Sequence, residues 1–258
     1  MVHRTLARGI ALLTLVIVAG GCLYRPDPTT VPIRTLPLVK AAGGSRCMVV
    51  FLPGRGDQLE DFLRHGFPAA LQRKGSRCAM IGVDSHLGYF YDRSIVRRLR
   101  EDVIAPARAE GIREIWLAGI SLGGFGSLLY AREYPEDVSG MVILAPFLGE
   151  EDVLREIESA GGLAAWSPQE EPGEKDLRRL WLFLKEYTNP LATNPPPLYL
   201  GYGTGDRFAK PNGLLAAALP PEHVFTTEGG HTWRVWRRLW ELFLENGPVP
   251  GRSAEPSR

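Results

Sequence analysis

The stretch WLAGISLGGFGSLLYA, residues 116–131, decides the fold, because it joins an apolar run to a helical pattern through a cluster of glycines. Within it, Gly119-Ile120-Ser121-Leu122-Gly123 fits G-x-S-x-G, a pattern in which a serine occupies a sharp turn between a strand and a helix. Flanking glycines let strand and helix approach closely, and the helix offers its first N–H groups to a developing negative charge. The stretch predicts either a plain tight turn or a turn that exposes a nucleophile.

The composition is that of an ordinary globular protein. The chain has 258 residues, of which 45% are apolar and 23% charged, and a formal net charge of +1. These values fit one domain of about 200 residues. The near-neutral charge and the lack of a basic run in the sequence argue against nucleic acid as a partner. The sequence does not indicate an oligomeric state.

The N-terminal segment has the features of an export signal. Residues 1–21 contain Arg4 and Arg8, the apolar run 10–19 and then small residues, as in a secretory signal peptide. The sequence AGGC, which ends at Cys22, resembles a bacterial lipobox, whose cysteine is diacylated. We therefore expect an exported lipoprotein, anchored to a bacterial membrane through Cys22 and facing the periplasm or the cell exterior. The alternative is a soluble secreted protein that is cleaved nearby.

From residue 47 onward, short apolar runs alternate with helical stretches. This alternation predicts an α/β fold with a doubly wound, mostly parallel sheet and helices on both faces. The expected strands are 47–52, 78–83, 114–119, 141–145, 198–203 and 223–227, with a further strand possible within 33–40. The expected helices are 57–73, 93–109, 121–133, 210–219 and 231–245.

The same pattern divides the chain into segments. Residues 22–46 are expected to form a lipidated tether, residues 47–246 the folded domain and residues 247–258 a flexible polar tail. Residues 147–197 interrupt the alternation with two helical stretches joined by a Gly/Pro-rich segment, so we expect a small helical cap there.

Two further cysteines, Cys47 and Cys78, each open an apolar run. If these runs form neighbouring parallel strands, the cysteines start in step and a disulfide has suitable geometry. Export would bring them into an oxidising compartment, where such bonds form. The sequence leaves open whether they form a disulfide or remain two buried thiols.

A serine hydroxyl is a weak nucleophile unless a neighbouring imidazole accepts its proton. We favour His231 as this base, because it lies in the glycine-containing loop EGGHTW directly after the last expected strand. The other histidines have less suitable positions in the leader, on a helix, after a strand and at a strand edge: His3, His65, His86 and His223.

An imidazole base needs a carboxylate to orient its far N–H. Asp206 follows the preceding strand through a short glycine loop and lies between Ser121 and His231 in the chain. The order Ser, Asp, His is the one that hydrolases with this serine turn use. Asp84 and Asp152, which also follow strands, are the alternative acids.

The segment Pro53-Gly54-Arg55-Gly56 ends the strand 47–52. Glycine permits the backbone to approach a substrate carbonyl, so we expect an oxyanion hole formed by the N–H groups of Arg55 and Leu122, with Gly54 beside them. The alternative is a plain turn between a strand and a helix.

Together these residues resemble the α/β-hydrolase superfamily over roughly residues 47–246. The sequences GISLGGFGSLLYA and GGHTWRVWRRLWELFL are similar to the esterase D / feruloyl-esterase-like branch, in which a Ser-x-Gly-Gly-x-Gly turn and a C-terminal His-x-Trp recur. The segment at Pro53 departs from the usual His-Gly opening.

The resemblance implies a serine hydrolase that cleaves a small-molecule carboxylic ester through an acyl-enzyme. It implies Ser121, Asp206 and His231 as the catalytic triad, and no metal or organic cofactor. The cap and the aromatic residues 89–91 are expected to shape the substrate pocket. An acyltransferase, a serine peptidase and a surface lipoprotein without catalytic activity are the alternatives, and fold alone does not name the ester.

Overall fold

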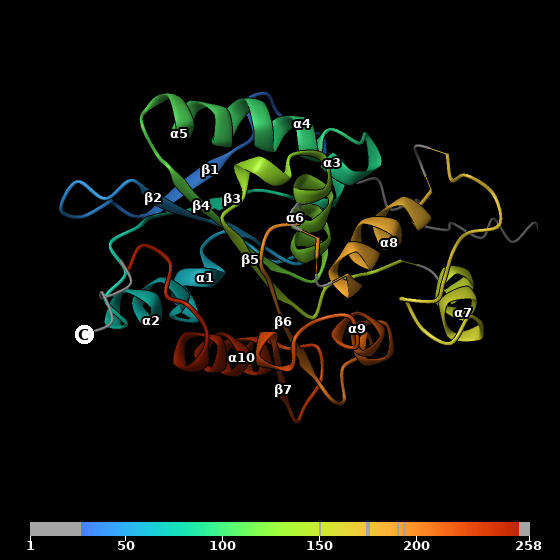
Figure 1. The fold of residues 1–258 in the computed structure, drawn as a ribbon. Coiled ribbons are helices and arrows are strands. Elements are labelled where there is room, and N and C mark those ends of the chain that lie inside the picture. The colour runs from blue at the N-terminus through green and yellow to red at the C-terminus, as the bar shows by residue number, and fades with distance from the viewer. Residues whose placement is uncertain (1–26, 150, 174–175, 190, 193–194, 253–258) are drawn as a thin grey trace, which may run out of the picture.

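Seven strands form one sheet in the order β1-β3-β2-β4-β5-β6-β7 (Figure 1). The structure is a computed structural model that describes residues 27–252 except 150, 174–175, 190 and 193–194. The strands are β1 (Thr35–Val39), β2 (Cys47–Leu52), β3 (Ala79–Val83), β4 (Glu114–Ile120), β5 (Gly140–Leu144), β6 (Leu198–Gly203) and β7 (Val224–Thr227). β1 pairs antiparallel with β3, and the other neighbours in the sheet are parallel. The predicted mostly parallel sheet is confirmed.

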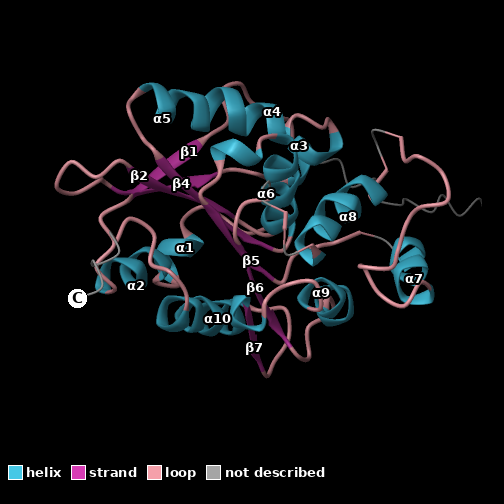
Figure 2. Ribbon diagram, viewed as in Figure 1, coloured by secondary structure: helices cyan, strands magenta, loops and turns pink. Residues whose placement is uncertain are grey.

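Helices cover both faces of this sheet (Figure 2). On one face lie α1 (Asp61–Arg64), α2 (Phe67–Arg73) and α10 (Trp233–Asn246), and on the other lie α4 (Ile95–Leu99), α5 (Ala105–Ala109) and α6 (Leu122–Glu133). Every residue of β2 and β5 is buried, because the central strands have helices on both sides. The sheet's C-terminal edge is therefore a rigid platform for the loops that follow the strands.

The segment expected as one helix over 57–73 is divided in two. Gly66 has φ 72°, a left-handed conformation that an α-helix cannot contain, and it separates α1 from α2. The aromatic residues 89–91, which are expected to shape the substrate pocket, lie in a short helix, α3 (Leu87–Tyr91). His86 caps it, since its Nδ1 accepts the N–H of Gly88 at 3.1 Å.

Upstream of residue 47, the chain adds an edge strand to the sheet. β1 lies within the range 33–40, where a further strand was anticipated, and Ile33 before it is buried. The sheet thus extends beyond the expected domain boundary into the range assigned to the tether. Residues 1–21 and Cys22 lie outside the described residues. No helix of the described ranges combines the length and apolar character needed to cross a bilayer.

The segment 147–197 contributes two helices, α7 (Glu151–Ser159) and α8 (Arg178–Lys185). α8 packs against α6, and Leu180 and Trp181 are fully buried. The indole N–H of Trp181 donates to the carbonyl of Leu148 at 2.9 Å. α8 is therefore joined to the core beside α6, the helix that follows Ser121.

After α10 the chain returns to the edge of the sheet where β4 begins. Val249 packs on the core, and the N–H of Gly251 donates to Glu114 at 3.1 Å. Residues 247–252, expected as the start of the flexible tail, have these contacts, and the remainder of the tail lies outside the described residues.

Cys47 and Cys78 form a disulfide, with their Cα atoms 4.5 Å apart. Cys47 begins β2 and Cys78 directly precedes β3, and the two are in register, since Met48 pairs with Ala79 across the parallel strands. The bond closes a loop that contains α1 and α2, which cover the sheet next to α10.

Replacing both cysteines by alanine should lower the free energy of unfolding by about 3–4 kcal/mol, the loop-closure value for a separation of 31 residues. Urea denaturation of the oxidised wild type and the double variant measures the difference. The reduced wild type is the control and should unfold like the variant. Equal urea midpoints for oxidised wild type and variant would contradict the prediction.

Candidate functional site

Ser121 lies at the turn between β4 and α6 in a conformation that residues other than glycine rarely adopt, with φ 51° and ψ −112°. Two glycines make this turn possible. A Cβ on Gly123 would lie 2.1 Å from the carbonyl oxygen of Leu52, and a Cβ on Gly119 would lie 2.5 Å from the carbonyl oxygen of Gly123. The sequence G-x-S-x-G is therefore required by contact between backbones.

His231 follows β7 and precedes α10. Its Nε2 lies 2.9 Å from the Oγ of Ser121, although the two residues are 110 positions apart. The imidazole ring packs edge-on against Phe208 and Trp236, with ring centroids 5.1 and 4.9 Å away. These aromatic contacts hold the ring in the orientation that faces the serine.

Asp206 follows β6, and its carboxylate is fully buried beneath the imidazole. Its oxygens lie 2.8 and 3.0 Å from Nδ1 of His231. One of them also accepts the N–H of Phe208 at 2.8 Å. Because a carboxylate only accepts hydrogen bonds, Nδ1 carries the proton and donates. In the neutral imidazole Nε2 is then the unprotonated nitrogen, and it accepts a hydrogen bond from the hydroxyl of Ser121.

The loops that carry Asp206 and His231 are bonded to each other. The N–H of Gly205 donates to the carbonyl of Gly229 at 3.0 Å. A Cβ on Gly203 would lie 2.3 Å from that same carbonyl oxygen, so a side chain there would separate the loops. Gly229 has φ 116°, which only glycine adopts readily. Backbone contacts at the sheet edge thus set the distance between Asp206 and His231.

The other described histidines are engaged elsewhere. His65 stacks on Trp233 with ring centroids 4.5 Å apart, His86 caps α3, and His223 packs on an aromatic ring of β6. His3 lies outside the described residues. None of the three described rings forms a hydrogen bond with Ser121.

The two alternative acids are also paired away from His231. Asp84 forms a salt bridge with Arg34 at 3.0 Å, and Asp152 forms one with Arg178 at 3.3 Å. Asp206 is therefore the carboxylate that the described structure brings to the imidazole.

The loop after β2 lies against the serine. A Cβ on Gly54 would be 3.4 Å from the Cβ of Ser121, so this loop and the turn are in direct contact. Leu122 is the first residue of α6, where N–H groups have no partner within the helix. Arg55 is the next residue in the loop and is exposed. The expected oxyanion donors thus come from segments that meet at Ser121.

Sequence reasoning missed a contact between this loop and α10. The indole N–H of Trp233 donates to the Asp57 carboxylate at 2.9 Å. Burial raises the pKa of the Asp57 carboxyl, while the bond from Trp233 acts in the opposite direction. The Asp57 carboxylate packs against Gly54, since a Cβ on Gly54 would lie 2.5 Å from its Oδ2. Trp233 is two residues after His231. No local pattern marks residues so distant in sequence as partners.

Comparison with known proteins identifies the fold. Residues 48–197, more than half of the chain, match the family model described as the alpha/beta hydrolase fold. No curated protein sequence matches the chain.

Several solved structures are similar in fold. The monoacylglycerol lipase of Paleococcus ferrophilus has a TM-score of 0.53 and 16% identity, and the match covers 82% of this chain and 98% of that one. The S-formylglutathione hydrolase of Staphylococcus aureus has a TM-score of 0.51 and 13% identity, with 77% and 79% covered. At such identities the likeness shows the fold alone.

Replacing Gly123 by alanine should cost about 1–3 kcal/mol of stability, the usual range for overpacking, because the added Cβ meets the Leu52 carbonyl at 2.1 Å. Gly173→Ala is the matched control, since an added Cβ there has nothing within 4 Å. Urea denaturation of both variants measures the loss. Equal midpoints for the two would contradict the assigned backbone contact.

Proposed function

The chain belongs to the α/β hydrolase fold family, and on that premise we propose that it is a serine hydrolase of carboxylic esters. In this proposal Ser121 is the nucleophile, His231 the general base and Asp206 the carboxylate that orients the imidazole. The observation that carries it is the 2.9 Å contact between Nε2 of His231 and Oγ of Ser121, continued by the bond from Nδ1 to Asp206.

In the first step, Oγ of Ser121 attacks the ester carbonyl carbon while Nε2 of His231 takes the hydroxyl proton. The buried Asp206 carboxylate stabilises the resulting imidazolium. The tetrahedral intermediate then collapses, the bond to the alcohol oxygen breaks, and the imidazolium returns its proton to that oxygen. The alcohol leaves, and the acyl group remains on Ser121.

In the second step, water repeats the sequence. His231 takes a proton from the water as its oxygen attacks the acyl carbon, and the proton then passes to Oγ of Ser121 as the acid is released. Both tetrahedral intermediates carry a negative oxygen. We propose that the N–H groups of Leu122 and Arg55 bind this oxygen, with Gly54 allowing the close approach. One such donor is typically worth about 2.7–4 kcal/mol of transition-state stabilisation.

We also propose that the protein is exported and anchored through a lipid on Cys22, a residue outside the described part of the chain. The support is the sequence alone: two arginines, an apolar run and the AGGC segment in residues 1–22. A lipid anchor would hold the hydrolase domain at a membrane surface.

Ser121→Ala should lower kcat/KM for p-nitrophenyl acetate by at least about 10,000-fold, because the nucleophile is lost while the fold remains. The matched control is Ser127→Ala in the same helix, whose hydroxyl donates to the Gly123 carbonyl at 2.9 Å and should be dispensable for turnover. Circular dichroism verifies the fold of both. Turnover that survives in Ser121→Ala, or an inactive but folded wild type, would refute the mechanism.

Adding an alcohol acceptor to the same assay separates hydrolysis from acyl transfer. We expect free acid as the main product at moderate glycerol concentrations. A new ester as the main product would instead identify an acyltransferase that uses the same nucleophile.

Expression of the full chain in a bacterium with a palmitate analogue should label the wild type and leave Cys22→Ser unlabelled. The wild type should partition into the detergent phase of Triton X-114 and the variant into the aqueous phase, since acyl chains supply the membrane affinity. Labelling that persists in Cys22→Ser, or wild type in the aqueous phase, would overturn the anchor.

A further inference from the structure

A pocket of about 280 Å³ runs along one face of α6 and is here called the α6 pocket. Phe125, Leu129 and Arg132 line it from α6, at the i, i+4, i+7 spacing of one helix face. The opposite walls come from the segments around α3, α4 and α8, with Phe90, Val96, Leu177 and Leu180. The lining combines these apolar side chains with the charged residues Arg93, Arg132 and Asp176.

The near end of the α6 pocket lies one helical turn from the nucleophile, since the N–H of Phe125 donates to the carbonyl of Ser121 at 3.1 Å. A row of aromatic rings continues from there to the base. Phe125 contacts Phe147 at 5.6 Å between ring centroids, Phe147 contacts Phe208 at 5.8 Å, and Phe208 contacts His231 at 5.1 Å. This row of ring contacts links the imidazole of His231 to Phe125 in the lining of the α6 pocket.

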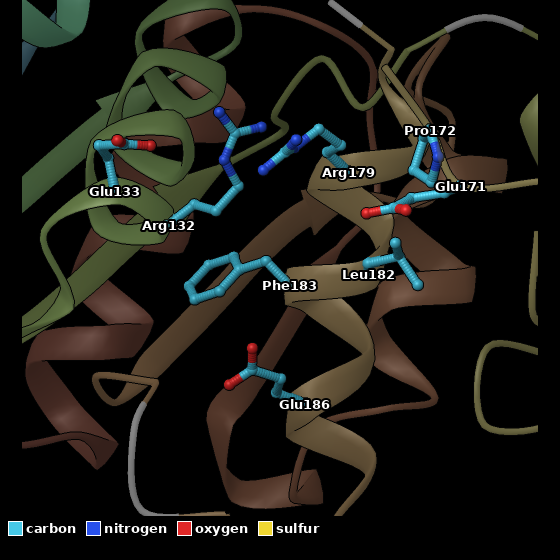
Figure 3. Close-up of a pocket in the computed structure, with 8 residues that line it drawn as sticks. All are labelled: Arg132, Glu133, Glu171, Pro172, Arg179, Leu182, Phe183 and Glu186. Atoms are coloured by element: carbon cyan, nitrogen blue, oxygen red, sulfur yellow. The ribbon is translucent and has the colours of Figure 1, made fainter. Parts of the chain in front are cut away.

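The far end of the α6 pocket carries the side chain of Arg132. Arg132 lies about 16 Å from Ser121 along the helix axis, at 1.5 Å per residue. Its side chain also lines a second cavity of about 310 Å³, together with Arg179 of α8. Figure 3 shows the two guanidinium groups pointing toward one another. In the described part of the chain, neither arginine forms an ion pair with an acidic side chain.

Acidic side chains also lie near the two arginines. Glu133, Glu171 and Glu186 line the second cavity without pairing with either arginine, and they sit around its rim in Figure 3. Asp176, which lines the α6 pocket, is bonded to Arg178 at 3.2 Å. Burial lowers the pKa of the Arg132 guanidinium, Glu133 opposes this, and the charge of Arg179 adds to it. An anion placed between the two guanidinium groups would accept charge-assisted hydrogen bonds from both.

We propose that the α6 pocket selects esters in which an apolar segment separates the ester group from a terminal carboxylate, and that Arg132 and Arg179 bind this carboxylate. The inference rests on the proposed function, because it takes Ser121 as the reacting residue. An acyl chain of roughly eight to twelve carbons matches the ~16 Å separation, given that helix side chains lean toward the N-terminus. The carboxylate could belong to the acyl or the alcohol part of the ester.

The test compares three p-nitrophenyl esters: the monoester of decanedioic acid, the neutral decanoate and the acetate. We expect the acidic ester to exceed the decanoate in kcat/KM by about tenfold, the effect of one charge-assisted hydrogen bond. Arg132→Gln should remove this preference, Arg132→Lys should keep part of it, and acetate turnover should be unchanged in both. Arg73→Gln, an exposed arginine of α2, is the matched control and should keep the preference. The acetyl ester of 10-hydroxydecanoic acid tests the alcohol side.

Acetate turnover separates the two proposals. The wild type could cleave the acetate yet show equal kcat/KM for acidic and neutral long esters, whether the carboxylate is in the acyl or the alcohol part. That result would refute the anion pocket and leave the proposed hydrolase in place. A preference that persists in Arg132→Gln refutes it as well. If the acetate is not cleaved, the proposed function fails. The anion pocket is then tested separately by measuring the binding of decanedioate. Decanedioate should bind Ser121→Ala, and adding Arg132→Gln should weaken its calorimetric Kd about tenfold; equal Kd values would overturn the assignment.

Discussion

The contact between Gly123 and the Leu52 carbonyl is the constraint on which the site depends. It brings the start of α6 against the end of β2, so that the serine turn and the loop at Gly54 meet. Ser121 must then adopt φ 51°, a conformation that costs about 1–3 kcal/mol for a residue with a side chain. The packed strand before it and the helix after it over-determine this geometry. The strain is thus located where a hydroxyl has to face the base.

Parallel strands place the remaining groups at the same edge. β4, β6 and β7 all end there, so residues 121, 206 and 231 converge although they are far apart in sequence. α10 begins just after His231 and is anchored by buried aromatic side chains, including Trp236 and Trp240. An imidazole held next to a firmly packed helix keeps its distance from the hydroxyl of Ser121. In the proposed mechanism, such a fixed arrangement supplies the preorganised geometry that catalysis requires.

The fold and the convergence of Ser121, Asp206 and His231 could be predicted from sequence because each has a local signature. Buried strands are continuous apolar runs, the serine turn is marked by glycines, and the acid and base follow strands through glycine loops. The break at Gly66 was missed because a glycine inside a helical pattern is only a weak signal. The bond between Asp57 and Trp233 and the facing pair Arg132 and Arg179 depend on how distant segments pack, which no local pattern encodes.

The central claim is that the imidazole of His231 turns the hydroxyl of Ser121 into a nucleophile. Mass spectrometry of the protein after treatment with a fluorophosphonate tests this directly, because the reagent bonds covalently only to an activated serine. We predict one adduct, on the peptide that contains Ser121, which forms rapidly in the wild type and is lost in a folded His231→Ala variant. An adduct on a different residue, or equal labelling of Ser121 with and without His231, would contradict the account.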